Sequence, residues 1–193
     1  NFKYPKSARL RDAERPIVIK DTNKNTPVQL VEEALKHKKN LSFEKDEVWV
    51  VYDRESPAKY SDELHAKALN AAKTNNIHVA ISNICFEYWL LLHLSNSAQA
   101  NSNCDSLIKS PTFVNGFKKI GVTDYDKKDK SAKCVAELLM KDEYLNAAIT
   151  NAERNNLNSI KSSQASESEP YKIQPYTNVH KLLSAIDDIA LYK

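Results

Sequence analysis

The sequence has very little glycine and cysteine, and these two scarcities exclude several classes of protein. Only two glycines occur in 193 residues, Gly116 and Gly121, which excludes the glycine-rich phosphate loops of Walker-type ATPases and dinucleotide-binding domains. The three cysteines, Cys85, Cys104 and Cys134, are widely spaced and form no C-x-x-C motif. Neither a zinc ribbon nor a disulfide framework is therefore expected, and the reducing cytoplasm is the predicted compartment.

Long apolar stretches and internal repeats are also missing. The longest apolar run, near residues 88–92, ends at His93 and is far shorter than a bilayer span, so no membrane partner is predicted. Hydrophobic residues make up 41% of the chain and charged residues 27%, which are the proportions of a globular domain. A chain of 193 residues suits one domain with a substantial buried core.

Hydrophobic patterning predicts alternating strands and helices in the first half of the chain. Runs of β-branched and aromatic residues predict strands at residues 16–20, 47–52 and 77–82. Helices are expected after each strand, with Thr26 as the candidate N-cap of the first and Ser61 or Asp62 near the cap of the second. Such β–α–β units build a mostly parallel sheet with helices on both faces. This α/β architecture is the predicted fold of residues 1–95.

Residues 96–193 are predicted to be a helical part that packs on the same domain. Amphipathic helices are expected at about 131–154 and 177–191, and polar composition predicts mobile stretches at about 95–103 and 155–169. The segment 109–133 contains seven lysines, three aspartates and no other acid or arginine, a net charge of +4. Both a solvated surface and a phosphate-contacting surface explain that charge.

Acidic residues follow two of the predicted strands, at the edge where sites gather in parallel α/β sheets. Asp53 ends the strand at 47–52, and Glu55 lies two residues on, so both carboxylates can face one point. Converging carboxylates repel each other unless a cation lies between them, and hard oxygen ligands suit Mg²⁺ or Mn²⁺. The alternative is an aspartate that caps the next helix beside an exposed glutamate. Glu87 begins the helix after the strand at 77–82, where either the helix dipole or a buried partner would stabilise it.

Several motifs resemble those of the RloB-like family of bacterial phage-defence proteins. SNICFEYWLLLH at 82–93 is similar to that family's S-N-P-C-F-E-x-W-L-L-L-H, with Ile84 where proline is usual. Four other segments resemble family segments in the same order: NTPVQLVEEAL (25–35), DEVWVVYDRE (46–55), YDKKDK (125–130) and YTNVHKLLSAI (176–186). The resemblance covers about residues 22–190.

The resemblance implies a TOPRIM-like fold and a magnesium-dependent nuclease that acts on DNA or RNA, transfer RNA included, in abortive defence against phage. It also implies an ATPase partner protein. Asp53 and Glu55 match the D-x-D/E metal motif of that fold, and Glu87 is expected to be a third ligand or a supporting acid. The residues expected to contact nucleic-acid phosphates are Arg54, Lys127, Lys128 and Lys130.

One family element is missing, and two other functions remain open. The first acidic motif of TOPRIM proteins is absent from residues 1–193, so we expect the complete protein to carry an upstream strand that ends in an acid. A catalytically silent regulatory or sensor subunit of an ATPase complex would need no complete metal site. A nucleic-acid-binding module without cleavage would use the lysine-rich segment alone.

Overall fold

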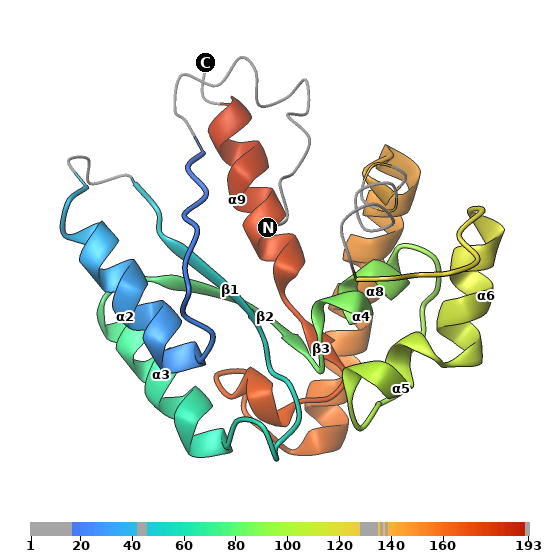
Figure 1. Cartoon of the computed structure of the whole chain (residues 1–193), viewed down its shortest axis with the longest axis horizontal. Helices are drawn as coiled ribbons and strands as arrows, with labels where there is room; N and C mark the ends of the chain where they lie inside the picture. Colours follow the sequence, from blue (N-terminus) through green and yellow to red (C-terminus); the bar gives the residue numbers. More distant parts are fainter. Residues whose placement is uncertain (1–16, 42–45, 128–134, 136, 138, 192–193) are drawn as a thin grey trace.

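The computed structural model describes residues 17–41, 46–127, 135, 137 and 139–191. Two helices, α2 (Pro27–Lys38) and α3 (Asp62–Thr74), lie together on one side of the sheet (Figure 1). The elements after the sheet's second strand gather at the other end of the molecule: α4 (Phe86–Leu92), α5 (Cys104–Ile108), α6 (Pro111–Lys119) and α8 (Asp142–Ser163). The short helix η1 (Pro170–Lys172) and the final helix α9 (Val179–Leu191) complete the chain.

Local sequence signals place the first helices as predicted. The hydroxyl of Thr26 accepts a hydrogen bond from the N–H of Gln29 at 3.3 Å, and Pro27 is the first helical residue of α2. Ser61 caps α3 in the same way, accepting from the N–H of Leu64 at 3.4 Å. Each cap satisfies a backbone donor that the helix leaves unpaired.

Within the described ranges the sheet has three strands in the order β1–β2–β3. β1 (Trp49–Asp53) and β2 (His78–Asn83) are parallel, with Asp53 opposite Ser82, whereas β3 (Tyr176–Thr177) is antiparallel to β2. The α/β class is confirmed, but the prediction of a mostly parallel sheet is wrong. A single β–α–β unit, β1–α3–β2, supplies the parallel pair, and a two-residue strand from the C-terminal part completes the sheet.

Asparagine side chains extend the pairing where β3 is too short. The amide of Asn178 donates to the carbonyl of Val79 at 2.9 Å and accepts from the N–H of Ile81 at 2.7 Å. On the other side of β3, the amide of Asn156 donates to the carbonyl of Thr177 at 2.7 Å and accepts from its N–H at 3.1 Å. Each amide thus presents one donor and one acceptor to a strand, as a neighbouring backbone would.

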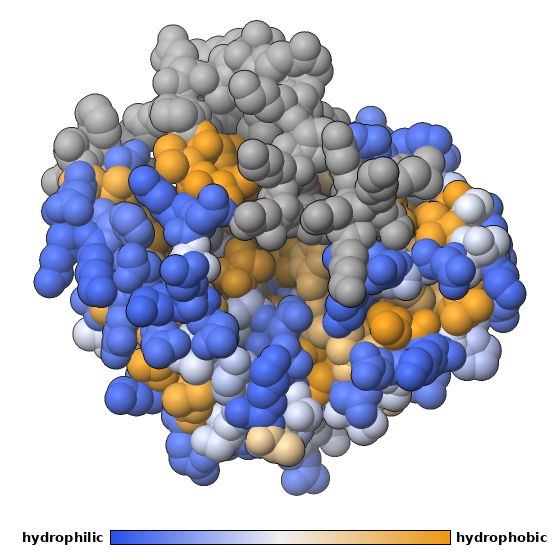
Figure 2. Space-filling view, in the orientation of Figure 1, coloured by the Kyte–Doolittle hydropathy of each residue, from blue (hydrophilic) through white to orange (hydrophobic). Residues whose placement is uncertain are grey.

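Two further predictions differ from the structure. Residues 17–20 form no strand, and Ile17, Val18 and Ile19 are 40%, 63% and 59% exposed. Figure 2 shows an apolar area where this segment runs in Figure 1. The predicted mobile linker at 155–169 is wrong for residues 155–163, which continue α8.

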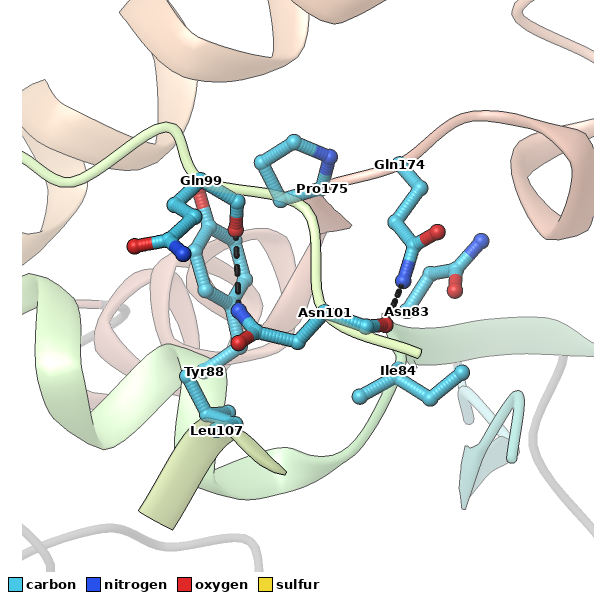
Figure 3. A pocket seen from close by; sticks show the side chains of 8 residues that line it. All are labelled: Asn83, Ile84, Tyr88, Gln99, Asn101, Leu107, Gln174 and Pro175. Atoms are coloured by element: carbon cyan, nitrogen blue, oxygen red, sulfur yellow. Dashed lines mark hydrogen bonds between the residues drawn. The ribbon is translucent and has the colours of Figure 1, made fainter. Parts of the chain in front are cut away.

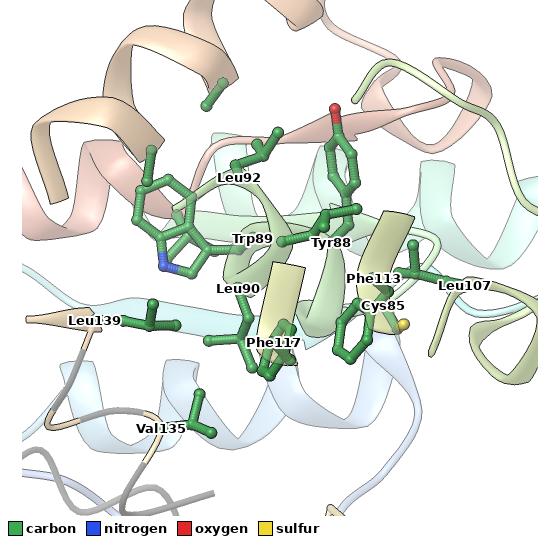
Figure 4. Close-up of a cluster of buried hydrophobic side chains, with 14 of the residues drawn as sticks. Cys85, Tyr88, Trp89, Leu90, Leu92, Leu107, Phe113, Phe117, Val135 and Leu139 are labelled. Carbon is green, nitrogen blue, oxygen red and sulfur yellow. The ribbon is translucent and has the colours of Figure 1, made fainter. Parts of the chain in front are cut away.

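Two hydrophobic clusters hold these elements together. One joins the sheet to α2 and α3 and includes Val31, Ile81 and Ala68. The other joins α4 to α5, α6, α8 and α9, and its largest members are Trp89 and Tyr88 (Figure 4). The segment from β2 into α4 belongs to both clusters, so the carboxyl ends of β1 and β2 are rigidly placed between them. In the described part of the chain, no helix has the length and apolar character needed to cross a membrane.

Candidate acidic site

Asp53 links the ends of the two parallel strands. It is the last residue of β1, and its Oδ1 accepts a hydrogen bond from the N–H of Phe86, the first residue of α4, at 2.8 Å. Cys85, the N-cap residue of α4, makes no side-chain capping bond. Asp53, at the end of β1, therefore caps α4, the helix that follows β2. Its second carboxylate oxygen is left for another partner.

Glu87 lies in the first turn of α4 and is only 6% exposed. Its Oε1 accepts a hydrogen bond from the hydroxyl of Tyr125 at 3.3 Å and lies 3.4 Å from the ammonium nitrogen of Lys127. Both partners come from the lysine-rich segment, which is thereby held against the start of α4. A buried carboxylate needs such partners, because desolvation strongly penalises an isolated charge.

Glu87 and the protein interior perturb Asp53. The pKa of Asp53 is raised from 3.8 to about 7, first by burial and then by the charges of Glu87 and Glu55. The N–H of Phe86 and the ammonium of Lys127 oppose that rise without cancelling it. Burial and the charge of Glu87 also raise the pKa of Tyr125 above its usual range. The site thus holds more negative charge than its own cations compensate, which is the electrostatic condition for binding a divalent cation.

Glu55 is close enough to influence Asp53 but is engaged elsewhere. Its backbone has a left-handed conformation, with φ of 61°, and its N–H donates to the carbonyl of Ile84 at 2.9 Å. Its Oε1 accepts from the ammonium of Lys59 at 2.7 Å. The ligand atoms of Asp53, Glu55 and Glu87 do not all lie within 4.8 Å of one another. The charges of both glutamates act on Asp53, but Glu55 is bound to Lys59 and Glu87 to Lys127, so a cation at Asp53 would compete with a lysine for either glutamate.

Arg54 has a structural role, which corrects the prediction that it contacts phosphates. It is 3% exposed. Its Nη2 donates to Asp62 at 2.6 Å, and its other nitrogens donate to the carbonyls of Tyr171 at 3.0 Å and Tyr60 at 2.9 Å. These bonds tie the turn after β1 to α3 and η1 and leave the guanidinium buried. Lys127 is a phosphate-contact candidate with a half-exposed side chain, and Lys128 and Lys130 lie outside the described residues.

Cys85 and Cys104 form a disulfide beside Glu87, contrary to the expectation from cysteine spacing. Cys85 and Leu107 both belong to the buried cluster around α4 (Figure 4). The sulfur of Cys104 lies 3.1 Å from Oε2 of Glu87 and 3.0 Å from the ammonium of Lys127. Because a disulfide sulfur carries no hydrogen, the approach to Glu87 is a contact rather than a hydrogen bond. The sequence analysis predicted neither Cys104 nor Tyr125 as a site residue, although the family segment YDKKDK includes this tyrosine.

A polar recess next to the site is not itself a binding cavity. It lies between the end of β2, α4 and the chain at residues 99–101, and Gln174 donates to the carbonyl of Asn101 across it (Figure 3). The recess is too tight to admit a water molecule. Its amides instead hold the loop before α5 against the sheet.

Fold and site together define a small α/β protein with an acidic site where β1 ends and α4 begins. The family model described as RloB-like protein matches residues 2–186, nearly the whole chain. The chain therefore belongs to the RloB-like family, which confirms the resemblance carried by its motifs. No curated protein and no solved structure matches the chain.

Proposed function

We propose that this protein is a divalent-cation-dependent nuclease that cleaves phosphodiester bonds of DNA or RNA. The observation that carries the proposal is the acidic pair formed by the half-buried Asp53, with its pKa raised to about 7, and the buried Glu87 whose charge contributes to that rise. Carboxylates forced together at a sheet edge are a common way to hold Mg²⁺ or Mn²⁺ in enzymes that act on phosphates. A TOPRIM-like relationship, which the family motif D-x-E implies, is part of this proposal.

Each residue has a distinct role in the proposed reaction. Asp53 and Glu87 would hold the cation, which would supply charge for the phosphate and activate the attacking water. Tyr125 fixes the orientation of Glu87 through its hydrogen bond. Lys127 lies at the exposed side of the site, where it can contact a substrate phosphate. We place the activity in the cytoplasm, in abortive defence beside an ATPase partner.

The decisive experiment measures cleavage of plasmid DNA, single-stranded RNA and transfer RNA with Mg²⁺, Mn²⁺ or EDTA. Asp53→Asn and Glu87→Gln preserve side-chain size and should remove metal-dependent cleavage. Glu32→Gln is the matched control, because Glu32 is an exposed acid on α2. Wild-type cleavage by a folded Asp53→Asn protein would refute the assignment.

One observation favours a second function, a catalytically silent regulatory subunit of an ATPase complex. Glu55 is paired with Lys59 and Glu87 with Lys127, so lysine ammonium groups already supply part of the charge that a metal would bring. A protein of this kind would cleave nothing with any metal, yet it would change the activity of its ATPase partner. Metal-dependent cleavage by the purified chain excludes this function.

A further inference from the structure

The two oxygens of Glu87 have different surroundings. Oε1 receives the hydroxyl of Tyr125 and the ammonium of Lys127, whereas Oε2 faces the sulfur of Cys104 at 3.1 Å. In the disulfide with Cys85 that sulfur has no hydrogen and donates nothing. A thiol at the same place carries an S–H group, which could donate to Oε2. The redox state of the cysteines therefore decides whether Oε2 has a donor.

The pair is placed so that reduction changes the site rather than the fold around it. The loop between the cysteines is held by other bonds: the carbonyl of Ser97 accepts from the hydroxyl of Tyr88 at 3.3 Å and from the amide of Asn155 at 2.9 Å. Breaking the S–S bond leaves these bonds in place. Its direct consequence is a pair of thiols, Cys85 and Cys104, whose sulfurs both lie within 4.8 Å of a carboxylate oxygen of Glu87.

We propose that Cys85 and Cys104 are a reversible dithiol–disulfide site that sets the affinity of the acidic site for divalent cations. In the reduced protein the Cys104 thiol donates a hydrogen bond to Oε2 of Glu87, so the carboxylate is stabilised less by binding a cation. In the oxidised protein Oε2 lacks that donor, and the cation is bound more tightly. The inference rests on the proposed function in one respect, that the acidic site takes a divalent cation.

The chemistry balances with a cellular monothiol as the reductant. Its thiolate attacks the sulfur of Cys104, forming a mixed disulfide, and Cys85 leaves as a thiolate that takes up a proton. A second thiol then releases Cys104 as a thiol and departs as the oxidised dimer of the reductant. The ammonium of Lys127, on a half-exposed side chain 3.0 Å from the sulfur of Cys104, lies where an anionic thiolate would approach.

The first test follows both the cysteines and the metal in the full chain. The protein is equilibrated in buffers of reduced and oxidised glutathione, free thiols are alkylated, and peptide mapping reports the state of Cys85 and Cys104. Mn²⁺ binding is measured by titration calorimetry in each state. We expect the pair to interconvert, and the reduced form to bind Mn²⁺ about fivefold more weakly, the effect of one weak hydrogen bond to a carboxylate.

A matched pair of variants separates the thiol donor from the cross-link. Cys104→Ser and Cys104→Ala both lack the disulfide, but only serine can donate to Glu87. Cys104→Ser should bind Mn²⁺ like the reduced protein and Cys104→Ala like the oxidised protein, and neither should respond to glutathione. Cys134→Ser keeps the pair and should respond as the wild type does.

The outcomes distinguish this inference from the proposed nuclease. Equal Mn²⁺ affinity in both redox states, or in the serine and alanine variants, overturns the redox control while leaving metal-dependent cleavage intact. A pair that never oxidises in glutathione buffers overturns it as well. If Mn²⁺ binds in no state, the metal site and its redox control fail together.

Discussion

Replacing Asp53 with asparagine should stabilise the fold above neutral pH. The folded protein holds this carboxyl with a pKa of about 7, against an ordinary value of 3.8. Between these values the folded state binds more protons than the unfolded state, so this group's contribution makes stability fall as pH rises from about 4 to 7. Asparagine has no charge to lose, and its oxygen can still accept from the N–H of Phe86.

The size of the effect follows from the same shift. The rise in the pKa of Asp53 from 3.8 to about 7 corresponds to a loss of about 4 kcal/mol in the free energy of unfolding at pH 8 when the full shift is counted. Asp53 is half-buried rather than fully enclosed, so solvent screening reduces this to about 2 kcal/mol. At pH 4 the difference between the two proteins should be close to zero, because the wild-type carboxyl is then protonated when folded.

Urea denaturation of both proteins in EDTA, from pH 4 to pH 8.5, measures this difference directly. Subtracting one curve from the other removes the contribution of the titrating groups that do not interact with Asp53, and Glu32→Gln should show no such trend. In EDTA-free buffer, Mn²⁺ at ten times its dissociation constant should stabilise the wild type by about 1.4 kcal/mol and the variant much less. If Asp53→Asn is no more stable than the wild type at pH 8, the buried-charge account of the site is wrong.

Three other predictions concern the surroundings of the site. Arg54→Ala should destabilise the fold by about 3 kcal/mol in urea titrations, because it leaves buried carbonyls unpaired; a loss below 0.5 kcal/mol would contradict the structural role. Reduction of the disulfide, which joins residues 19 apart, should lower the free energy of unfolding by about 3 kcal/mol. The wild type should therefore melt at a lower temperature when reductant is added, whereas the melting temperature of Cys104→Ala should not change. Lys127→Met should weaken binding to all nucleic-acid sequences alike and reduce the slope of affinity against salt, whereas an unchanged slope would remove Lys127 from the substrate surface.

The sequence predicted the elements that have strong local signals. The β-branched run at β1 and the proline and hydroxyl caps of α2 and α3 are local features, and their positions were found to within a few residues. Asp53 was placed correctly at a strand end because a charged residue cannot continue a buried strand. The placement of Glu87 at the start of α4, beside a strand end, follows from the same local reasoning.

The features that were missed depend on distant partners. β3 has two residues, too few for a pattern, and it exists because Ser82 and Asn83 pair with it. The second half of α8 was read as a linker because it is polar, yet Asn155 and Asn156 are buried through hydrogen bonds. Arg54 looks like a surface cation in the sequence, and only the carbonyls around it show that it is structural. Pairing and burial of polar groups are properties of the assembled fold.

The asparagine amides beside β3 determine at which edge the sheet can accept a further strand. Asn178 and Asn156 occupy the backbone groups that an added strand would need at that end, so the β3 side is closed to further pairing. Among the described residues no strand pairs with the outer edge of β1, where Val51 is 48% exposed. Open strand edges are templates for association with other chains or segments. Any strand that joins this sheet, from this protein or from another, must therefore join it at β1, next to the strand that ends in Asp53.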